Sequence, residues 1–290
     1  MTDVLVHTHE HVMDYNVSMI QNKTMVIEHN YGFYSNCSVR LKFIFKYFNI
    51  KRELPEYIDT TPSFSWYKEK GKDDNDVFYD LFMKPCEAGE TGLNIPYTHH
   101  INYYDFQFDN FKEFAIIDEI IPFIKRFYMP RYEIIQILSA MLQKYNIDYD
   151  NTCAIFYRGN DKAGEMILGD YDDFIAKAQK VQEDNPGMRF LIQSDETEFI
   201  YKCKQNLQNC VVFEDEIRHI SRSQNGHVDR IDLDNYTYAK YFLAIIIIIA
   251  KCKHLIMNSG NISMWIYFYR HMYNSKNAHN FHQSLKNAWV

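Results

Sequence analysis

The chain has 290 residues, of which 47% are hydrophobic and 16% are aromatic, a composition that excludes a disordered protein. Its formal net charge of −7 excludes a global basic field that would attract nucleic acid or an anionic membrane surface. A chain of this length can bury a large core in one domain or in two, and we expect two lobes.

The segments that could direct the chain to a membrane do not have the required patterns. The stretch from Met1 to Glu10 is polar, whereas a secretory signal has a basic start followed by an apolar run. The most apolar window, Tyr236 to Met257, is interrupted by lysines before it reaches membrane-spanning length. The six cysteines are dispersed and form no C-x-x-C pair, which is typical of reduced thiols. We therefore predict a cytoplasmic protein without a membrane span.

The first half of the chain has an irregular pattern. Apolar spacing predicts a strand at Thr24–Glu28 and a helix at Val39–Phe48, with a loop at Asn30–Ser38 between them. The stretch Asp59–Asn75 mixes Thr, Pro, Ser, Gly, Lys and Asp, which indicates a long surface loop that could meet a substrate.

The second half alternates helical spacing with short apolar runs. This alternation indicates a parallel sheet with helices on both faces, the doubly wound α/β arrangement. We place a boundary after residue 129, which gives lobes of residues 1–129 and 130–290. The predicted elements are a helix after Pro130 that includes Ile134 to Leu142, a strand at Cys153–Tyr157, a helix at Tyr171–Glu183, a strand at Arg189–Gln193, a helix at Glu196–Asn206, a strand at Cys210–Phe213, a helix at Asn235–Lys251, a strand at His254–Met257 and a helix at Asn261–Tyr273.

Polar residues follow three of these strands. Ligands of open parallel sheets bind beyond the carboxyl ends of the strands, so we expect these residues to lie together. Arginine and lysine beside a helix N-terminus rich in Ser, Asn and Gly make a site for a diphosphate, because guanidinium, hydroxyl and backbone N–H groups all donate to its oxygens. The three segments are Arg158-Gly-Asn-Asp161-Lys162, Ser194-Asp195-Glu196 and Asn258-Ser259-Gly260-Asn261-Ile-Ser263.

Each of these segments also has a purely structural interpretation. The turn Ser259–Ser263 could simply cap the following helix, and Asp195 could be an N-cap as well. Arg158 and Asp161 could form a local ion pair that supports their turn. Both interpretations stay open at the level of sequence.

The sequence FYRGNDKAGE, at 156–165, resembles the H-x-R-R-x-D-K-x-G-x-E segment of the α1,6-fucosyltransferase and nodulation-fucosyltransferase group. Later segments resemble that group in the same order, and the resemblance covers roughly residues 123–285. The segments are FLIQSDE, HLIMNSGNISMWIYFYR and HNFHQSL, with a fainter match of NYGFYSNCSVRL, at 30–41, to the first Gly-containing loop of the group.

The resemblance implies a GT-B glycosyltransferase with two Rossmann-like lobes that face a central cleft. It further implies inversion at the transferred sugar without a metal ion or other cofactor, with GDP-fucose as donor and a glycan hydroxyl as acceptor. Arg158 matches the arginine that holds the β-phosphate. Glu165 falls near the catalytic base, although this chain is one residue shorter between Gly164 and that glutamate. The donor-binding residues are predicted to be Arg158, Asp161, Lys162, Ser194, Asp195, Ser259, Gly260, Asn261, Ser263, Gly32 and Asn36.

Two positions depart from the group. Phe156 stands where the group has a guanine-reading histidine, and Ile245 stands about where it has an aspartate. A guanine edge buried against these side chains would leave its polar groups unpaired, at about 1–3 kcal/mol for each. A UDP-sugar such as UDP-xylose is therefore an alternative donor, and a nucleotide- or glycan-binding module that has lost catalysis is an alternative function.

Trp66 lies on the predicted polar loop and is our candidate for stacking on the acceptor sugar, since a sugar ring presents C–H groups to a π-surface. No G-x-G-x-x-G follows a predicted strand, which disfavours a Rossmann-type oxidoreductase.

Overall fold

The computed structural model divides the chain into two compact units. Unit 1 comprises the described parts of residues 1–105 together with 118–131 and 233–239, and unit 2 comprises the described parts of the remainder. The assignment of residues 1–129 to an acceptor-side lobe and of 130–290 to a nucleotide-sugar lobe stays a prediction. The structure describes residues 16–20, 24–87, 100–101, 107, 109–164, 167–224, 228, 234–273 and 280–284.

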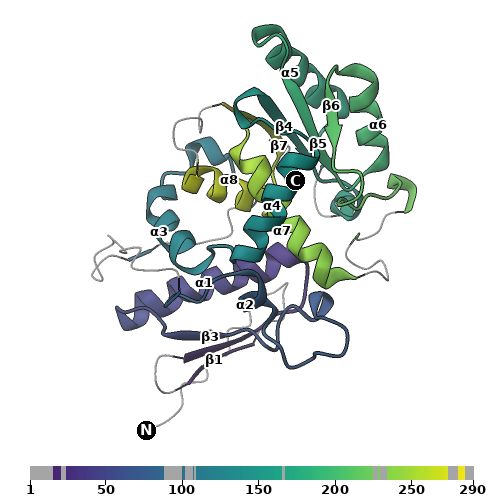
Figure 1. Ribbon diagram of the computed structural model, residues 1–290. Helices are drawn as coiled ribbons and strands as arrows, with labels where there is room; N and C mark the ends of the chain where they lie inside the picture. Colours follow the sequence, from purple (N-terminus) through teal and green to yellow (C-terminus); the bar gives the residue numbers. More distant parts are fainter. Residues whose placement is uncertain are drawn as a thin grey trace. The chain divides into compact units, whose positions relative to one another are not determined.

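Unit 1 contains a three-stranded sheet in the order β1-β2-β3 (Figure 1). β1 (Asn16–Ile20) pairs antiparallel with β2 (Thr24–Glu28), and β3 (Tyr57–Asp59) pairs parallel with β2. A parallel pair needs a crossover connection, and α1 (Phe33–Lys51) provides it. The predicted strand at Thr24–Glu28 is thus confirmed.

Helix α1 begins at Phe33, so the predicted loop at Asn30–Ser38 is wrong beyond Gly32. The reason is that the apolar face continues toward the N-terminus, where Phe33 and Cys37 are buried. Farther along, the rings of Phe45 and Phe48 contact Phe123, with centroids 4.7 and 5.4 Å apart. Phe123 belongs to α3 (Ile117–Phe127), so these two helices share the core of unit 1.

Two short elements complete unit 1. They are α2 (Val77–Leu81) and a 3-10 helix, η1 (Ser65–Tyr67), which lies within the predicted long loop. Phe64 and Tyr67 on either side of Trp66 are fully buried, so this loop is packed onto the core rather than lying loosely over the surface.

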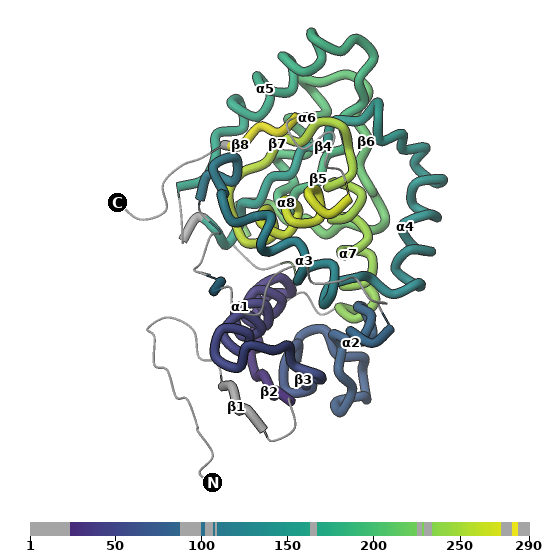
Figure 2. Tube along the Cα trace, turned by 90° about the vertical axis from the view of Figure 1, so that its left-hand side faces the viewer, coloured from purple at the N-terminus to yellow at the C-terminus, as the bar shows by residue number. Residues whose placement is uncertain are grey.

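Unit 2 contains a five-stranded, wholly parallel sheet in the order β6-β5-β4-β7-β8, seen side by side in Figure 2. The α/β alternation and the parallel sheet are as the sequence predicted. The elements are α4 (Tyr132–Lys144), β4 (Thr152–Tyr157), α5 (Tyr171–Asp184), β5 (Arg189–Ser194), α6 (Thr197–Asn206), β6 (Cys210–Val212), α7 (Asn235–Lys251, its first residues in unit 1), β7 (His254–Asn258), α8 (Asn261–Tyr273) and β8 (Phe281–Ser284), with 3-10 helices at Phe111–Glu113 (η2), Tyr149–Asn151 (η3), Asn160–Gly164 (η4) and Arg222–Gln224 (η5).

Helices cover both faces of this sheet. α5 packs on β4, β7 and β8, and α6 packs on β5. The ring of Tyr157 stacks on Phe199 of α6 at 4.4 Å, while the preceding residue, Phe156, points to the other face because side chains alternate along a strand. Figure 1 shows α7 and α8 on that other face, as right-handed crossovers require.

The apolar run of α7 explains why this helix lies inside the fold. The residues from Ile245 to Ile249 are all buried, so the run serves the core of unit 2. None of the described helices combines the length and the apolar character that crossing a membrane requires.

Candidate functional site

Arg158 is the first residue beyond β4, and its main chain is held by Asn258, the last residue of β7. The backbone N–H of Arg158 donates to Asn258 Oδ1 at 3.2 Å, and Asn258 Nδ2 donates back to the Arg158 carbonyl oxygen at 3.0 Å. The side-chain amide of Asn258 thus takes the place of main-chain hydrogen bonds at the point where β4 and β7 stop pairing. It fixes where Arg158 leaves the sheet.

The guanidinium of Arg158 lies between two carboxylates. Nη2 is 2.6 Å from Asp161 Oδ1, and Nη1 pairs with Asp195 Oδ2. The three side chains are only 12%, 8% and 6% exposed, so the ion pairs are largely shielded from water. The local ion pair that the sequence left open is therefore present, and Arg158 Nε is buried without a hydrogen-bond partner.

Asp195 joins this turn to the end of β5. Its Oδ1 accepts the N–H of Gly159 at 2.9 Å, and its carbonyl oxygen accepts from the side chain of Asn160. The N-cap position of α6 belongs to Glu196, so the structural interpretation of Asp195 as an N-cap is wrong. Ser194 accepts the N–H of Glu196 at 3.0 Å and supports the same turn.

Glu196 belongs to one of the three predicted segments, but the sequence did not show that its carboxylate holds the turn after Arg158. Its carboxylate is fully buried and accepts the N–H of Asn160 at 2.6 Å and the hydroxyl of Tyr171. Burial, followed by the contact with Glu196, raises the pKa of Tyr171. A Cβ on Gly159 would stand 2.2 Å from the Glu196 carboxyl carbon, so any larger residue here would force the Glu196 side chain to move.

The N-terminus of α8 lies at the same edge of the sheet, because it follows Asn258 in the chain. Gly260 has φ of 148°, and its carbonyl accepts the N–H of Met264 at 2.9 Å. The N–H groups of the first turn of a helix have no intrahelical acceptor and give this end a partial positive charge. Ser263 Oγ, in this turn, is buried without a hydrogen-bond partner. Asn261 is the first helical residue.

Ser259 is connected to the last strand. Gln283 Nε2 donates to Ser259 Oγ at 3.0 Å and to the carbonyl oxygen of Asp109 at 2.9 Å. Gln283 Oε1 accepts the N–H of Phe111 at 3.0 Å. The segment HNFHQSL therefore brings a glutamine to the turn before α8.

The remaining residues of unit 2 that the sequence singled out differ in how far the structure defines them. Lys162 lies in η4, half-buried, and its N–H donates to Gly159 O at 2.8 Å. Glu165, the predicted base, lies outside the described residues. Phe156 is 2% exposed and Ile245 is fully buried, so both positions are occupied by core side chains.

Gly32, Asn36 and Trp66 lie in unit 1. Gly32 is the N-cap residue of α1. Asn36 Nδ2 donates to Tyr31 O at 2.7 Å and to Gly32 O at 3.2 Å, while its Oδ1 is buried without a partner. Trp66 is partly exposed in η1, and its ring centroid lies 6.4 Å from that of Tyr31.

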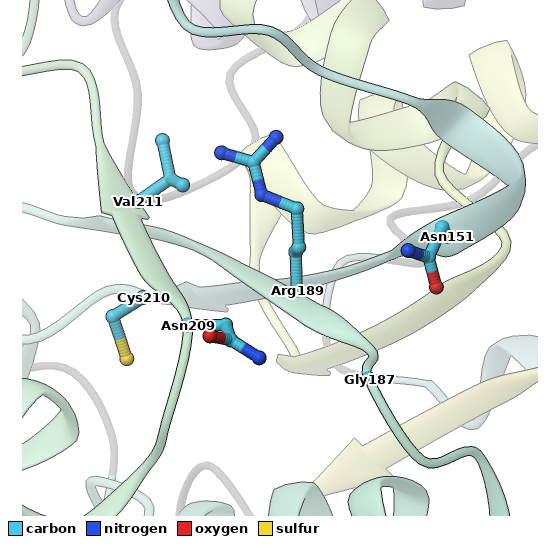
Figure 3. Close-up of a pocket in the computed structure, with 6 residues that line it drawn as sticks. All are labelled: Asn151, Gly187, Arg189, Asn209, Cys210 and Val211. Atoms are coloured by element: carbon cyan, nitrogen blue, oxygen red, sulfur yellow. The ribbon is translucent and has the colours of Figure 1, made fainter.

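A solvent-open hollow of about 380 Å³ lies at the opposite end of the unit 2 sheet, where β4, β5 and β6 begin (Figure 3). Arg189 projects there and donates to the carbonyl oxygens of Tyr145 and Asn146. Burial raises the pKa of the Cys210 thiol to about 11. The hollow is separate from the Arg158 site, because Arg158 follows the carboxyl end of β4 whereas the hollow lies at the amino ends of the strands. Its lining residues are Asn151, Gly187, Arg189, Asn209, Cys210 and Val211.

No family model matches the chain, and no curated protein matches it either. Among solved structures, the chain is similar to a crystal structure of NodZ alpha-1,6-fucosyltransferase soaked with GDP-fucose, with 7% sequence identity and a TM-score of 0.35. The aligned part covers 53% of this chain and 47% of that one, so this chain matches about half the length of its neighbour.

Proposed function

We propose that this protein is a glycosyltransferase that binds a nucleotide-sugar donor at the carboxyl edge of the unit 2 sheet and transfers the sugar to a glycan hydroxyl. The observation that carries the proposal is the pair of hydrogen bonds by which Asn258 holds Arg158. It brings a guanidinium and the N-terminus of α8 to one edge of a parallel sheet. Both groups attract phosphate oxygens.

In this proposal the reaction inverts the anomeric centre and needs no metal ion. The acceptor oxygen forms a bond to the anomeric carbon while the bond from that carbon to the diphosphate breaks. Glu165 takes the proton of the acceptor hydroxyl, and Arg158 and the α8 N-terminus stabilise the negative charge of the departing diphosphate. The two-lobed GT-B arrangement and the choice between a GDP- and a UDP-sugar belong to the same proposal.

The carboxylates around Arg158 compete with a departing diphosphate for the guanidinium, which favours a second candidate, a nucleotide- or glycan-binding module that has lost catalysis. Asp161 and Asp195 both pair with the guanidinium, so three formal charges sum to −1 at this point. A guanidinium has five N–H donors, and two of its nitrogens contact these carboxylates. A diphosphate would then have to accept from the remaining donors, or displace one carboxylate.

Nucleotide binding is tested by thermal unfolding of the full chain with GDP and with UDP. We expect one of them to raise the midpoint, since a ligand of the native state stabilises it by mass action. Arg158→Lys keeps the positive charge beside both carboxylates and loses the planar fork, so it should weaken binding about tenfold. Arg189→Lys is the matched control, because Arg189 lies at the amino end of β5, away from the proposed site, and this variant should bind as the wild type does. Unchanged binding in Arg158→Lys would refute the assignment.

Catalysis is tested separately with Glu165→Gln. The proposal expects this variant to bind the nucleotide normally and to lose most hydrolysis of the nucleotide-sugar, measured as free sugar released over hours. A wild-type chain that binds the nucleotide but hydrolyses none of its sugar conjugates above the buffer rate would instead identify the binding module.

A further inference from the structure

Two partly exposed aromatic rings lie at the carboxyl ends of β2 and β3 in unit 1. Tyr31, just after β2, is 39% exposed. Its centroid lies 6.4 Å from that of the half-buried Trp66, and the ring planes are tilted by 57°. We propose that this aromatic pair, Tyr31 and Trp66, binds a sugar ring of an uncharged glycan acceptor, an inference that rests on the proposed transferase function.

The aromatic pair is held by a rigid frame. Asn30 Nδ2 donates to the Pro62 carbonyl oxygen at 2.9 Å, and Asn30 Oδ1 accepts the N–H of Ser65, also at 2.9 Å. One side chain next to Tyr31 therefore fixes both ends of the turn that leads to Trp66. A surface ordered before binding loses little conformational entropy when the ligand arrives.

A second set of hydrogen bonds anchors the same turn to the sheet. Ser63 Oγ donates to the Ile27 carbonyl oxygen at 2.7 Å and accepts the N–H of His29 at 3.0 Å. Beneath it, the Tyr67 hydroxyl accepts the N–H of Phe33 at 2.7 Å. The turn is thus bound at several points to β2 and to the start of α1, although it has little regular structure.

Tyr31 and Trp66 are more exposed to solvent than the aromatic residues close to them in sequence. Phe64 and Tyr67 flank Trp66 in sequence and are fully buried, and Phe33 beside Tyr31 is 2% exposed. Unit 1 therefore buries the surrounding rings and leaves Tyr31 and Trp66 partly open to solvent. Aromatic faces carry negative charge density, which attracts the C–H groups on one face of a sugar ring.

The chemistry around the pair favours an uncharged sugar over a nucleotide. A nucleotide also needs donors for its phosphates, most often Lys or Arg. The two segments that build the surface, 29–32 and 60–66, contain neither residue. They instead supply hydroxyl and carbonyl groups, among them the exposed Ser65, that suit the hydroxyls of a sugar.

The test measures binding of the full chain to three neutral probes, chitotetraose, cellotetraose and xylotetraose, by saturation-transfer NMR and calorimetry. We expect at least one probe to bind, and Trp66→Ala and Tyr31→Ala each to weaken it at least about fivefold. Tyr132→Ala, which removes a 69% exposed tyrosine from α4 in unit 2, is the matched control and should leave the affinity unchanged. Circular dichroism checks that each variant is folded.

The inference is overturned if none of the probes binds, or if a probe binds equally well to both aromatic variants and to the control. Loss of GDP or UDP binding in these variants would also overturn it, because the pair would then stack on a nucleobase. Nucleotide binding that survives while every oligosaccharide fails leaves the transferase proposal standing and removes only the aromatic-pair site.

Discussion

At the scale of single residues, the side chain of Asn258 fixes the position of the Arg158 main chain. Asn258→Ala removes both hydrogen bonds to the Arg158 main chain, and we expect a loss of about 1–3 kcal/mol in the free energy of unfolding. Asn258→Asp should be at least as harmful, because an oxygen replaces the amide that donates to the Arg158 carbonyl. Urea unfolding measures the stability, and calorimetry with GDP or UDP measures the effect on binding.

The control for this prediction is Asn206→Asp. The amide of Asn206 also donates to a carbonyl oxygen, that of Lys202 at 2.9 Å, but on the exposed end of α6. Its stability should change by less than about 0.5 kcal/mol. Equal losses at the two positions would show that Asn258 has no special role.

Gly159 is constrained by the Glu196 carboxylate rather than by its backbone angles. Gly159→Ala places a methyl group 2.2 Å from the carboxyl carbon, so we expect a destabilisation of about 1–3 kcal/mol from overpacking. The combination with Glu196→Ala should show strong non-additivity, because the clash disappears with the side chain. Additive losses in a double-mutant cycle of unfolding free energies would contradict the close approach.

The residues of the site differ in how far the sequence could predict them. Arg158 and Asp195 were predictable because each follows a clear buried strand. Asn258 was recognisable only as the start of a turn, since nothing in a sequence shows that its amide reaches a main chain 100 residues away. Of the two ion pairs of Arg158, the sequence offered only the one with Asp161 as an alternative, because the pair with Asp195 depends on how two separate turns meet.

At the scale of elements, two half-buried histidines give the last part of the sheet a pH dependence. His254 begins β7, and both ring nitrogens are buried without a hydrogen-bond partner. Its pKa is lowered from the ordinary value of 6.5 by burial, and next by Lys253. His282 of β8 also has a lowered pKa, chiefly because of burial.

The lowered pKa values of the two histidines determine how the stability changes with pH. When the pH falls through about 6.5, the unfolded chain binds protons at both positions before the folded chain does. The free energy of unfolding should therefore decrease as the pH drops from 7 toward 5. His254→Gln should flatten this slope in urea unfolding, and the exposed His100→Gln of unit 1 should not. A slope that is steeper or unchanged in His254→Gln would contradict the assignment.

The elements of unit 2 were more predictable than those of unit 1. Long apolar faces and continuous buried runs defined α7 and α8 to the residue. β8 was missed because Phe281–Ser284 contains one apolar residue, and its position depends on pairing with β7. The buried Arg270 helps to hold it by donating to Asn280 O at 3.2 Å, a contact that no local pattern reveals.

At the scale of the whole molecule, the division into units could not be drawn as a single cut in the sequence. Residues 118–131 and 233–239 join unit 1, although unit 2 residues lie on both sides of each segment. Linear patterning detects where elements begin and end, but not which distant segments return to the same core.

The proposed mechanism also predicts the response of the whole protein to chelation. Because Arg158 and the α8 N-terminus stabilise the diphosphate in this scheme, EDTA should change the rate of donor hydrolysis less than about twofold. The assay compares dialysed protein with and without EDTA. A loss of hydrolysis that added Mg²⁺ or Mn²⁺ restores would show that the scheme lacks a metal ion.

The hold of Asn258 on Arg158 also has a consequence for the order in which a ribosome releases the chain. β4 and β5 can pair once residue 194 has emerged, yet the neighbour on the other side of β4 is β7, which is made much later. During this interval Arg158 can already meet Asp161 and Asp195, while its main chain still lacks Asn258. The nascent protein can therefore form its carboxylate pairs first and fix its arginine last, and the proposed donor site is completed only after residue 258 and the first turn of α8 have emerged.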